Sequence, residues 1–361
     1  MEKELNSGID IDLGNQCSRI AYNWAKKTFT HREPGSGNPL MSADGGFSSL
    51  MDFNGVKIGI SSDGIGTKIE LAERTGIYNT IGFDLVAMVA DDLAANGIET
   101  VNLSYILDVD LLDAEIVDEL MEGLYEAAKF AKITVTGGEI AELGSRIGGY
   151  GSKMHFNWCA TGVGILADGK EMIDGKNIRP GDVIISLRSR GFRSNGFSLL
   201  RKIVAQNFGP DWHQVSYNQN QTWGEVLLTP SLIYSPLVAA MIKQNVKING
   251  VVHVTGGGLA DNLSRILKIN QYGADLTDIF EPLPVMKKIQ EIGQVPEEQA
   301  YQLWNMGNGM LIILGSEQLS DALALIRQNK YEACECGRIT DKFTITIESR
   351  GIQAKRLVYG G

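Results

Sequence analysis

The chain has 361 residues, which is enough for two domains of ordinary size. Hydrophobic residues make up 43% and charged residues 21%, a composition typical of a soluble globular protein. The net charge of −10 argues against a nucleic-acid partner, because binding a phosphate backbone needs clustered Lys and Arg to displace counterions.

The termini, cysteines and histidines narrow the class further. The charged start at residues 1–4 leads into no apolar stretch, so no signal peptide is predicted, and apolar runs are too short to span a bilayer. The four cysteines are scattered and form no disulfide framework, so we expect a cytoplasmic protein without a membrane partner. The four histidines share no metal-ligand spacing, which argues against a zinc site or a Ser-His-Asp triad.

The first half of the chain opens with a region rich in turn residues. Residues 31–46 contain several Gly and Pro and show no periodicity, which predicts a loop that is either disordered or a functional lid. Strands and helices then alternate. We expect strands over residues 56–60, 133–135 and 156–166, and helices over residues 82–95 and 113–131.

The second half starts after a polar stretch dense in turn residues, 168–182. A strand over residues 183–187 is followed by a Gly/Ser/Asn loop and a helix from Phe197. A strand over 251–254 is followed by Gly256-Gly257-Gly258 and a helix from about Ala260. Because strands and helices alternate in both halves, the predicted fold class is α/β or α+β, with domains over residues 1–167 and 168–361.

The first candidate for chemistry is Asp63-Gly64-Ile65-Gly66-Thr67-Lys68, at the end of an expected strand. No Walker P-loop or dinucleotide fingerprint occurs, so a nucleotide would have to be held in another way. The two glycines can turn the backbone amides toward an anion, Lys68 supplies a positive charge and Asp63 could hold Mg²⁺. The alternative is a glycine turn with a solvated Lys and a capping Asp.

Three carboxylates on the helix over 82–95 form the second candidate. Asp84 and Asp91 lie two turns apart and therefore share a face, and Asp92 follows directly. The rest of the helix is apolar, so these acids would repel one another in a buried setting unless a cation lies among them. Mg²⁺ bound by Asp91 or Asp92 is the preferred interpretation. Otherwise these acids face solvent or cap a neighbouring loop.

The third candidate is Gly137-Gly138-Glu139-Ile140-Ala141-Glu142, expected just past a strand end, where ligands of open sheets bind. Glu139 could join the metal ligands, or the segment could be a surface turn. Two further loops resemble anion cradles, because each would present amides and a helix N-terminus. They are Arg190 to Gly196 and His253 to Gly258, although each could also be a glycine turn without a ligand, and His253 could be a core histidine.

Taken in order, these segments resemble the phosphoribosylformylglycinamidine cyclo-ligase (AIR synthetase) family over nearly the whole chain. The family's D-G-V-G-T-K is similar to residues 63–68, and its G-I-D-L-V-A-M followed by N-D to residues 82–92. Its other motifs are G-G-E-T-A-E, H-S-N-G-Y-S-L, P-T-R-I-Y, A-H-I-T-G-G-G and F-N-M-G-I-G-M, which are similar to residues 137–142, 193–199, 230–234, 252–258 and 304–310.

The resemblance implies an enzyme of purine biosynthesis that uses ATP and Mg²⁺ to cyclise formylglycinamidine ribonucleotide to aminoimidazole ribonucleotide through an iminophosphate. It implies two α/β domains and a homodimer in which sheets of both subunits close a barrel. Carried over, catalytic roles fall on Asp63, Lys68, Asp92 and His253, and metal binding on Asp63, Asp91, Asp92 and Glu139. ATP binding falls on Gly45, Gly46, Gly64, Gly66, Thr67 and Asp84, and binding of the phosphorylated substrate on Arg193, Ser194, Asn195, Gly196, Thr255, Gly256, Gly257 and Gly258.

The chain also departs from the family pattern. Arg193 stands where the family has His, and Asp91 where it has Asn. If that His polarises the reacting amide, His253 or Arg193 must act instead. The alternatives are a superfamily relative, such as formylglycinamidine ribonucleotide synthetase or selenophosphate synthetase, and a non-catalytic nucleotide-binding homologue. Selenophosphate synthetase needs a reactive residue near the N-terminus, and Cys17 lacks the usual Gly-rich setting.

Overall fold

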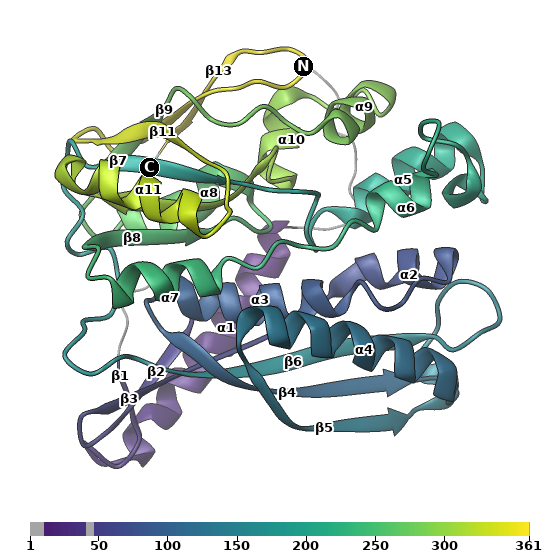
Figure 1. Cartoon of the computed structure of the whole chain (residues 1–361), viewed down its shortest axis with the longest axis horizontal. Helices are drawn as coiled ribbons and strands as arrows, with labels where there is room; N and C mark the ends of the chain where they lie inside the picture. The colour runs from purple at the N-terminus through teal and green to yellow at the C-terminus, as the bar shows by residue number, and fades with distance from the viewer. Residues whose placement is uncertain (1–10, 41–46, 361) are drawn as a thin grey trace.

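The computed structural model describes residues 11–40 and 47–360, and it contains two β-sheets with helices packed against them (Figure 1). Gly45 and Gly46, expected at a lid over ATP, lie outside the described residues. Two sheets with interspersed helices confirm the predicted α/β class. Within the described residues, no helix is both long enough and apolar enough to cross a membrane.

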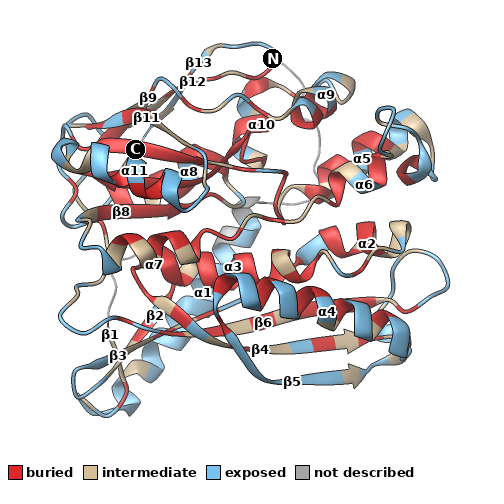
Figure 2. Cartoon of the chain, viewed as in Figure 1, coloured by how far each residue is buried: buried red, intermediate tan, exposed pale blue. Residues whose placement is uncertain are grey.

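The first sheet has six strands in the order β1-β2-β3-β6-β4-β5, and all neighbours are antiparallel except β4 and β5. Helices α3 and α4 cover one face, and the outer strand β5 is largely exposed (Figure 2). The strands are β1 (Asn38–Leu40), β2 (Ser49–Phe53), β3 (Val56–Gly64), β4 (Glu99–Val109), β5 (Thr134–Glu142) and β6 (Phe156–Ile165), and the helices are α1 (Ile11–Lys27), α2 (Ile69–Thr75), α3 (Gly82–Ala95) and α4 (Ala114–Ala131).

The second sheet has seven strands in the order β13-β12-β9-β11-β7-β10-β8. Side chains of β7 alternate between two apolar clusters, one shared with α7 and α11 and the other with α8, so helices cover both faces. The strands are β7 (Val183–Arg188), β8 (Ile248–His253), β9 (Gly273–Leu276), β10 (Asn308–Leu314), β11 (Ala333–Thr340), β12 (Thr344–Glu348) and β13 (Arg356–Gly360). The helices are α5 (Phe197–Phe208), α6 (Trp223–Leu227), α7 (Ser235–Lys243), α8 (Gly258–Leu267), α9 (Pro284–Ile292), α10 (Glu297–Leu303) and α11 (Leu319–Gln328).

Helix α3 lies between the two sheets and is buried along almost its whole length (Figures 1 and 2). It contacts β3, β6 and α4 of the first half and α7 and β8 of the second half. Its first residue, Gly82, touches Gly123 of α4 so closely that a Cβ at Gly82 would lie 2.4 Å from the Gly123 carbonyl carbon. The sequence therefore uses small residues to bring α3 and α4 together, and the buried carboxylates of α3 lie between the halves.

Two sequence expectations need correction. Strand β5 is much longer than the expected 133–135, so Gly137 to Glu142 lies inside a strand and not past its end. Asp63 and Gly64 likewise belong to β3, which was expected to stop at Ile60. In both cases Gly and polar residues are tolerated because a paired neighbouring strand satisfies the backbone. The helices over 82–95 and 113–131 are confirmed, the second with Asp113 as its N-cap.

Candidate active site

Two of the predicted acids come together where β3 meets α3. Asp63 lies at the end of β3, and Asp92 lies on α3, where its Oδ2 accepts a hydrogen bond from Ser61 Oγ at 3.3 Å. Burial is the main cause that raises the pKa of Asp63 above its ordinary value, and the negative charge of nearby Asp92 raises it further. The two carboxylates therefore lie close enough to oppose each other's ionisation, which is the setting that attracts a cation.

A chain of four polar side chains extends from Asp92 into the second half. His253 Nδ1 lies 2.7 Å from Asp92 Oδ1, and His253 Nε2 lies 2.8 Å from an Nη of Arg193. The same Nη lies 2.8 Å from Asp91 Oδ2. His253, Arg193 and Asp91 are at most 1% exposed, whereas the Asp92 side chain is 17% exposed. Asp92 is thus the end of the chain that faces a possible ligand.

Asp91 has a different environment from Asp92, although the two are adjacent. Its Oδ1 accepts hydrogen bonds from the backbone N–H groups of Tyr234 and Ser235, both at 2.8 Å, at the start of α7. Its Oδ2 pairs with Arg193, whose other Nη donates to the Leu232 carbonyl at 3.0 Å. Burial alone would lower the pKa of Arg193, but the charge of Asp91 and hydrogen bonds raise it. Asp91 therefore caps α7 and neutralises Arg193, and these partners leave it no open side for a metal.

Lys68 also differs from the expectation that it contacts phosphates. Its ammonium donates to both oxygens of Asp84 at 2.8 Å and to the Thr229 carbonyl at 2.7 Å, which uses all three of its protons. Asp84 additionally accepts from the Ser231 hydroxyl and backbone N–H. Both side chains are 0% exposed, and burial lowers the pKa of Lys68 and raises that of Asp84. The pair joins α3 to the segment before α7.

The glycine turns of the two halves approach each other beside the acids. A Cβ at Gly66 would lie 3.9 Å from the Ser194 carbonyl, and the hydroxyls of Thr67 and Ser198 are 3.5 Å apart. On the other side, a Cβ at Gly256 would lie 3.4 Å from Asn195 Oδ1. The structure therefore brings together three segments that the sequence indicated separately: residues 63–67, 193–198 and 253–258.

Two helix N-termini open into this region without a side-chain cap. Gly196 precedes α5 and Gly257 precedes α8, and both have the positive φ that favours glycine, +76° and +98°. The first turn of α5 holds no acid, whereas the Asp261 carboxylate lies against Gly257 at α8. Among the described residues, Ser194 Oγ and Asn195 Nδ2 are buried polar atoms without a hydrogen-bond partner. The start of α5 is therefore the better anion site.

Glu139 does not join the other acids within one chain. It pairs in register with Ile106 of β4, which pairs with Cys159 of β6, which in turn pairs with Gly64 of β3. At about 4.8 Å per strand spacing, Glu139 is about 14 Å from Gly64. Residues in one register row share a face, so Glu139 lies on the exposed face with Ile106, opposite the face that α3 covers. Its expected part in the metal site is not supported by this geometry.

The remaining acids still fit a magnesium ion. Among the described residues, no group of three or more His, Cys, Asp and Glu side chains is arranged to hold a metal. Mg²⁺ does not need one, because it is commonly bound by one or two carboxylates together with substrate phosphates and water. Asp63 and Asp92 supply two carboxylates beside an anion site. The donor set therefore suits Mg²⁺ brought in with a nucleotide.

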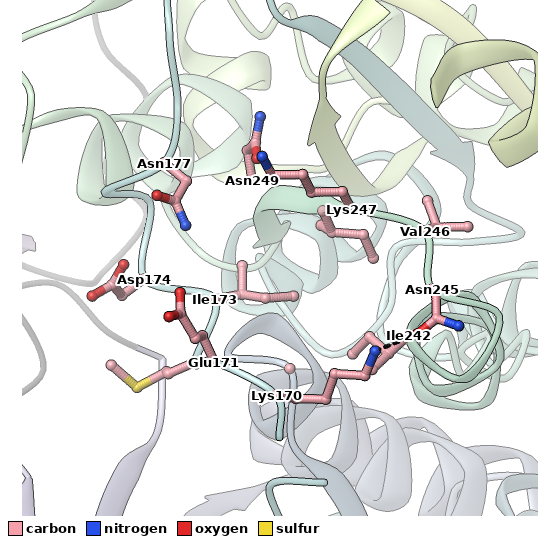
Figure 3. Close-up of a pocket in the computed structure, with 13 residues that line it drawn as sticks. Lys170, Glu171, Ile173, Asp174, Asn177, Ile242, Asn245, Val246, Lys247 and Asn249 are labelled. Carbon is pink, nitrogen blue, oxygen red and sulfur yellow. Dashed lines mark hydrogen bonds between the residues drawn. The ribbon is translucent and has the colours of Figure 1, made fainter. Parts of the chain in front are cut away.

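A pocket elsewhere in the molecule contains none of the predicted site residues. It has a volume of about 300 Å³ and lies between the segment 170–177 and the end of α7 with the start of β8 (Figure 3). Lys170 donates to Asn245 across its edge at 2.6 Å, and Lys247 and Asn249 line the opposite side. Its ionic groups are paired or exposed, and we assign no function to it.

Sequence reasoning missed the partners that hold the acids in place. Ser61, Thr229 and Ser231 each bind a site carboxylate or Lys68, and no local pattern in the sequence marks them. The only signal was the similarity of residues 230–234 to a family motif, which gave no role. These contacts join positions more than 30 residues apart, so only the folded chain reveals them.

Both halves of the chain match one family of proteins. Its description as AIR synthase related protein, N-terminal domain, matches residues 48–165, and the C-terminal domain matches residues 179–349. A phosphoribosylformylglycinamidine cyclo-ligase from Thermococcus kodakarensis is 34% identical over 347 residues, covering 96% of this chain and 98% of the relative. Proteins of the same name from Carboxydothermus hydrogenoformans and Methanobrevibacter smithii are 35% and 32% identical, covering 92% and 95% of this chain and 95% and 96% of the relatives.

Solved structures with a similar fold are more distant in sequence. AaThiL complexed with AMPPCP and TMP has a TM-score of 0.63 at 14% identity and covers 94% of this chain and 96% of that one. The hydrogenase maturation protein HypE in complex with ATP has a TM-score of 0.57 at 17% identity, with coverage of 83% and 84%. At these identities the likeness concerns the fold alone.

Proposed function

This chain belongs to the family of AIR synthase related proteins that includes the phosphoribosylformylglycinamidine cyclo-ligases, and we propose that it catalyses the cyclo-ligase reaction. ATP would drive ring closure of formylglycinamidine ribonucleotide to aminoimidazole ribonucleotide, with ADP and phosphate as the other products. The observation that carries the proposal is the Asp63–Asp92 pair beside the open N-terminus of α5, in a chain that aligns with named cyclo-ligases over nearly its full length. Cytoplasmic location, expected from the sequence, stays a prediction.

The chemistry explains why such a site is needed. The formyl oxygen of the substrate is a poor leaving group, and phosphorylating it gives an iminophosphate from which an attacking nitrogen can expel phosphate. Most of the catalysis is therefore positioning and neutralisation of charge on a transferring phosphoryl group. Mg²⁺ held by Asp63 and Asp92 would supply part of that neutralisation. Likenesses to proteins solved with ATP and AMPPCP support nucleotide binding by this fold.

We assign the two ligands to different parts of the site. Gly64, Gly66 and Thr67 follow Asp63 directly, so they would contact the phosphates of ATP. The N-terminus of α5 would hold the phosphate of the ribonucleotide, because Ser194 Oγ and Asn195 Nδ2 lack partners there. Residues 255–258 would complete the substrate side. Lys68 and Asp84, fully paired and buried, would support the site without touching the nucleotide.

A homodimer is supported by the uncovered face of the first sheet. Ile106 and Ile165 are 51% and 43% exposed on this face, and Ile58, Ile60 and Val163 lie beside them in register. An apolar sheet face of this kind is normally covered by another layer. We therefore propose that a second copy of the chain packs on it. Ile106→Glu should convert the dimer to monomer in sedimentation experiments, and an unchanged mass would contradict the assignment.

One assay tests the proposed reaction. The purified protein is incubated with formylglycinamidine ribonucleotide, ATP and Mg²⁺, and formation of the aminoimidazole product and ADP is followed. Asp63→Asn should lower turnover at least about 100-fold, because one of two metal carboxylates is lost while the side-chain shape is kept. Asp341→Asn, an exposed acid on the second sheet, should turn over normally. Full turnover by Asp63→Asn would show that the metal role is wrong, and a wild-type protein without turnover would exclude the reaction.

A further inference from the structure

We propose that His253 is a positioning residue for Asp92 and that Arg193 sets its tautomer, so that His253 exchanges no proton with the substrate. The role of Asp92 as a metal ligand rests on the proposed function, but the tautomer does not. The proposal replaces the expectation that His253 acts directly in catalysis.

The tautomer follows from the chemistry of arginine. A guanidinium group carries five N–H donors and no acceptor, so in its 2.8 Å contact with Arg193, Nε2 of His253 must accept. A neutral imidazole has one donor and one acceptor nitrogen, so the proton lies on Nδ1. Nδ1–H is then the donor to Asp92 Oδ1 at 2.7 Å. An imidazolium would place an N–H against the guanidinium, and the alternative tautomer would leave Nδ1 facing a carboxylate with no proton between them.

Arg193 is held rigidly enough to impose this choice. Its guanidinium is bound by Asp91 and by the Leu232 carbonyl and lies 5.0 Å from the centre of the Tyr234 ring. Its backbone has φ of +60°, a conformation that a long side chain seldom adopts and that the surrounding contacts must enforce. Such strain is common at functional sites.

The result is a carboxylate fixed from two sides. Oδ1 of Asp92 accepts from His253, and Oδ2 accepts from Ser61 Oγ at 3.3 Å, which leaves further lone pairs on both oxygens for a cation. Residues that orient a metal ligand in this way typically change metal affinity 10–100-fold when they are replaced. Because His253 is 0% exposed and both its nitrogens are engaged, its effect reaches a ligand only through Asp92.

The test reads the ring nitrogens directly. The full-length protein is labelled with ¹⁵N-histidine, and long-range ¹H–¹⁵N correlations identify which nitrogen of each ring carries the proton. The chain has four histidines, so the His253→Gln spectrum assigns the signal by its disappearance. We expect a neutral ring protonated at Nδ1. A wild-type ring protonated at Nε2, or at both nitrogens, overturns the proposal whether or not the protein is a cyclo-ligase.

A variant then tests the link to Asp92. Arg193→Met alone would leave Asp91 unpaired and could unfold the protein, so it is combined with Asp91→Asn. The double variant should lose the single-tautomer signature of His253, and its affinity for Mn²⁺ in the presence of AMPPCP, measured by electron paramagnetic resonance, should fall about 10–100-fold. Unchanged Mn²⁺ affinity despite a changed tautomer would refute the positioning role. Failure of the cyclo-ligase assay with both results as expected would refute only the reaction.

Discussion

Exchanging the buried pair Asp91 and Arg193 for Asn and His should show that the two positions change together. They are the two clearest departures from the cyclo-ligase pattern, and the structure places them in contact at 2.8 Å with at most 1% exposure. Asp91→Asn leaves a buried guanidinium without its counter-charge, and Arg193→His leaves a buried carboxylate without one. Removing one partner of such a pair costs about 3–5 kcal/mol, whereas replacing both with neutral groups is often neutral.

The size of the effect can be worked out for thermal unfolding. With an unfolding entropy of about 2.1 cal/mol/K per residue, cooperative unfolding of the chain has about 0.8 kcal/mol/K, so each single variant should lower Tm by about 4–7 °C. The double variant should return to within about 1–2 kcal/mol of wild type, because it loses only the bond from Arg193 to the Leu232 carbonyl. His also tolerates the positive φ at position 193 better than Arg does.

The assay is a double-mutant cycle by calorimetry and urea unfolding. Glu126→Gln is the control, because the Lys129–Glu126 pair is 60% and 49% exposed and its loss should be nearly silent. A double variant whose destabilisation equals the sum of the two single losses would refute the argument, since it would mean that the charges of Asp91 and Arg193 do not depend on each other.

Two further predictions concern the first half. Burial opposes ionisation of both members of the His155–Asp110 pair, but their mutual hydrogen bonds outweigh it, which raises the pKa of His155 and lowers that of Asp110. The pair therefore stabilises fully between the ordinary values of 3.8 and 6.5, and loses this contribution as pH rises through the raised histidine pKa or falls through the lowered carboxyl pKa; the Tm difference between wild type and His155→Gln should shrink at alkaline pH, and a pH-independent difference would contradict this. Gly123→Ala should destabilise by about 1–3 kcal/mol despite the better helix propensity of Ala, because its Cβ would lie 2.4 Å from the Asn79 carbonyl oxygen, whereas Gly14→Ala, with open space around it, should be neutral or stabilising in the same urea titration.

The sequence predicted the parts of the fold that depend on local pattern. The helix over 82–95 was recognisable because its apolar run ends at Asn96-Gly97, and α4 because Asp113 caps an amphipathic stretch. Strand β4 was missed, because its polar residues alternate with apolar ones across an uncovered face. The length of β5 was underestimated for a related reason: Gly137 and Gly138 look like a turn until β4 pairs with them.

The candidate site was predictable in membership more than in arrangement. Composition and order indicated Asp63, Asp92 and the two glycine loops, and the structure brings them together. Three adjacent-looking acids on α3 gave no indication that Asp84 and Asp91 are each neutralised by a distant cation. Lys68 and Arg193 meet them only after the halves pack. The roles of charged residues were therefore misjudged where a long-range partner consumed the charge.

The position of α3 has a consequence for how the two halves can move. Asp84 binds Ser231, and Asp91 binds Arg193 and the start of α7, so each buried carboxylate of α3 fastens the first sheet to the second. A hinge along this line would tear two charged groups from their partners in a dry interior. Opening and closing around a nucleotide must then be the work of surface loops, and a chain cut between the sheets would yield two fragments that each expose half of a broken ionic lock.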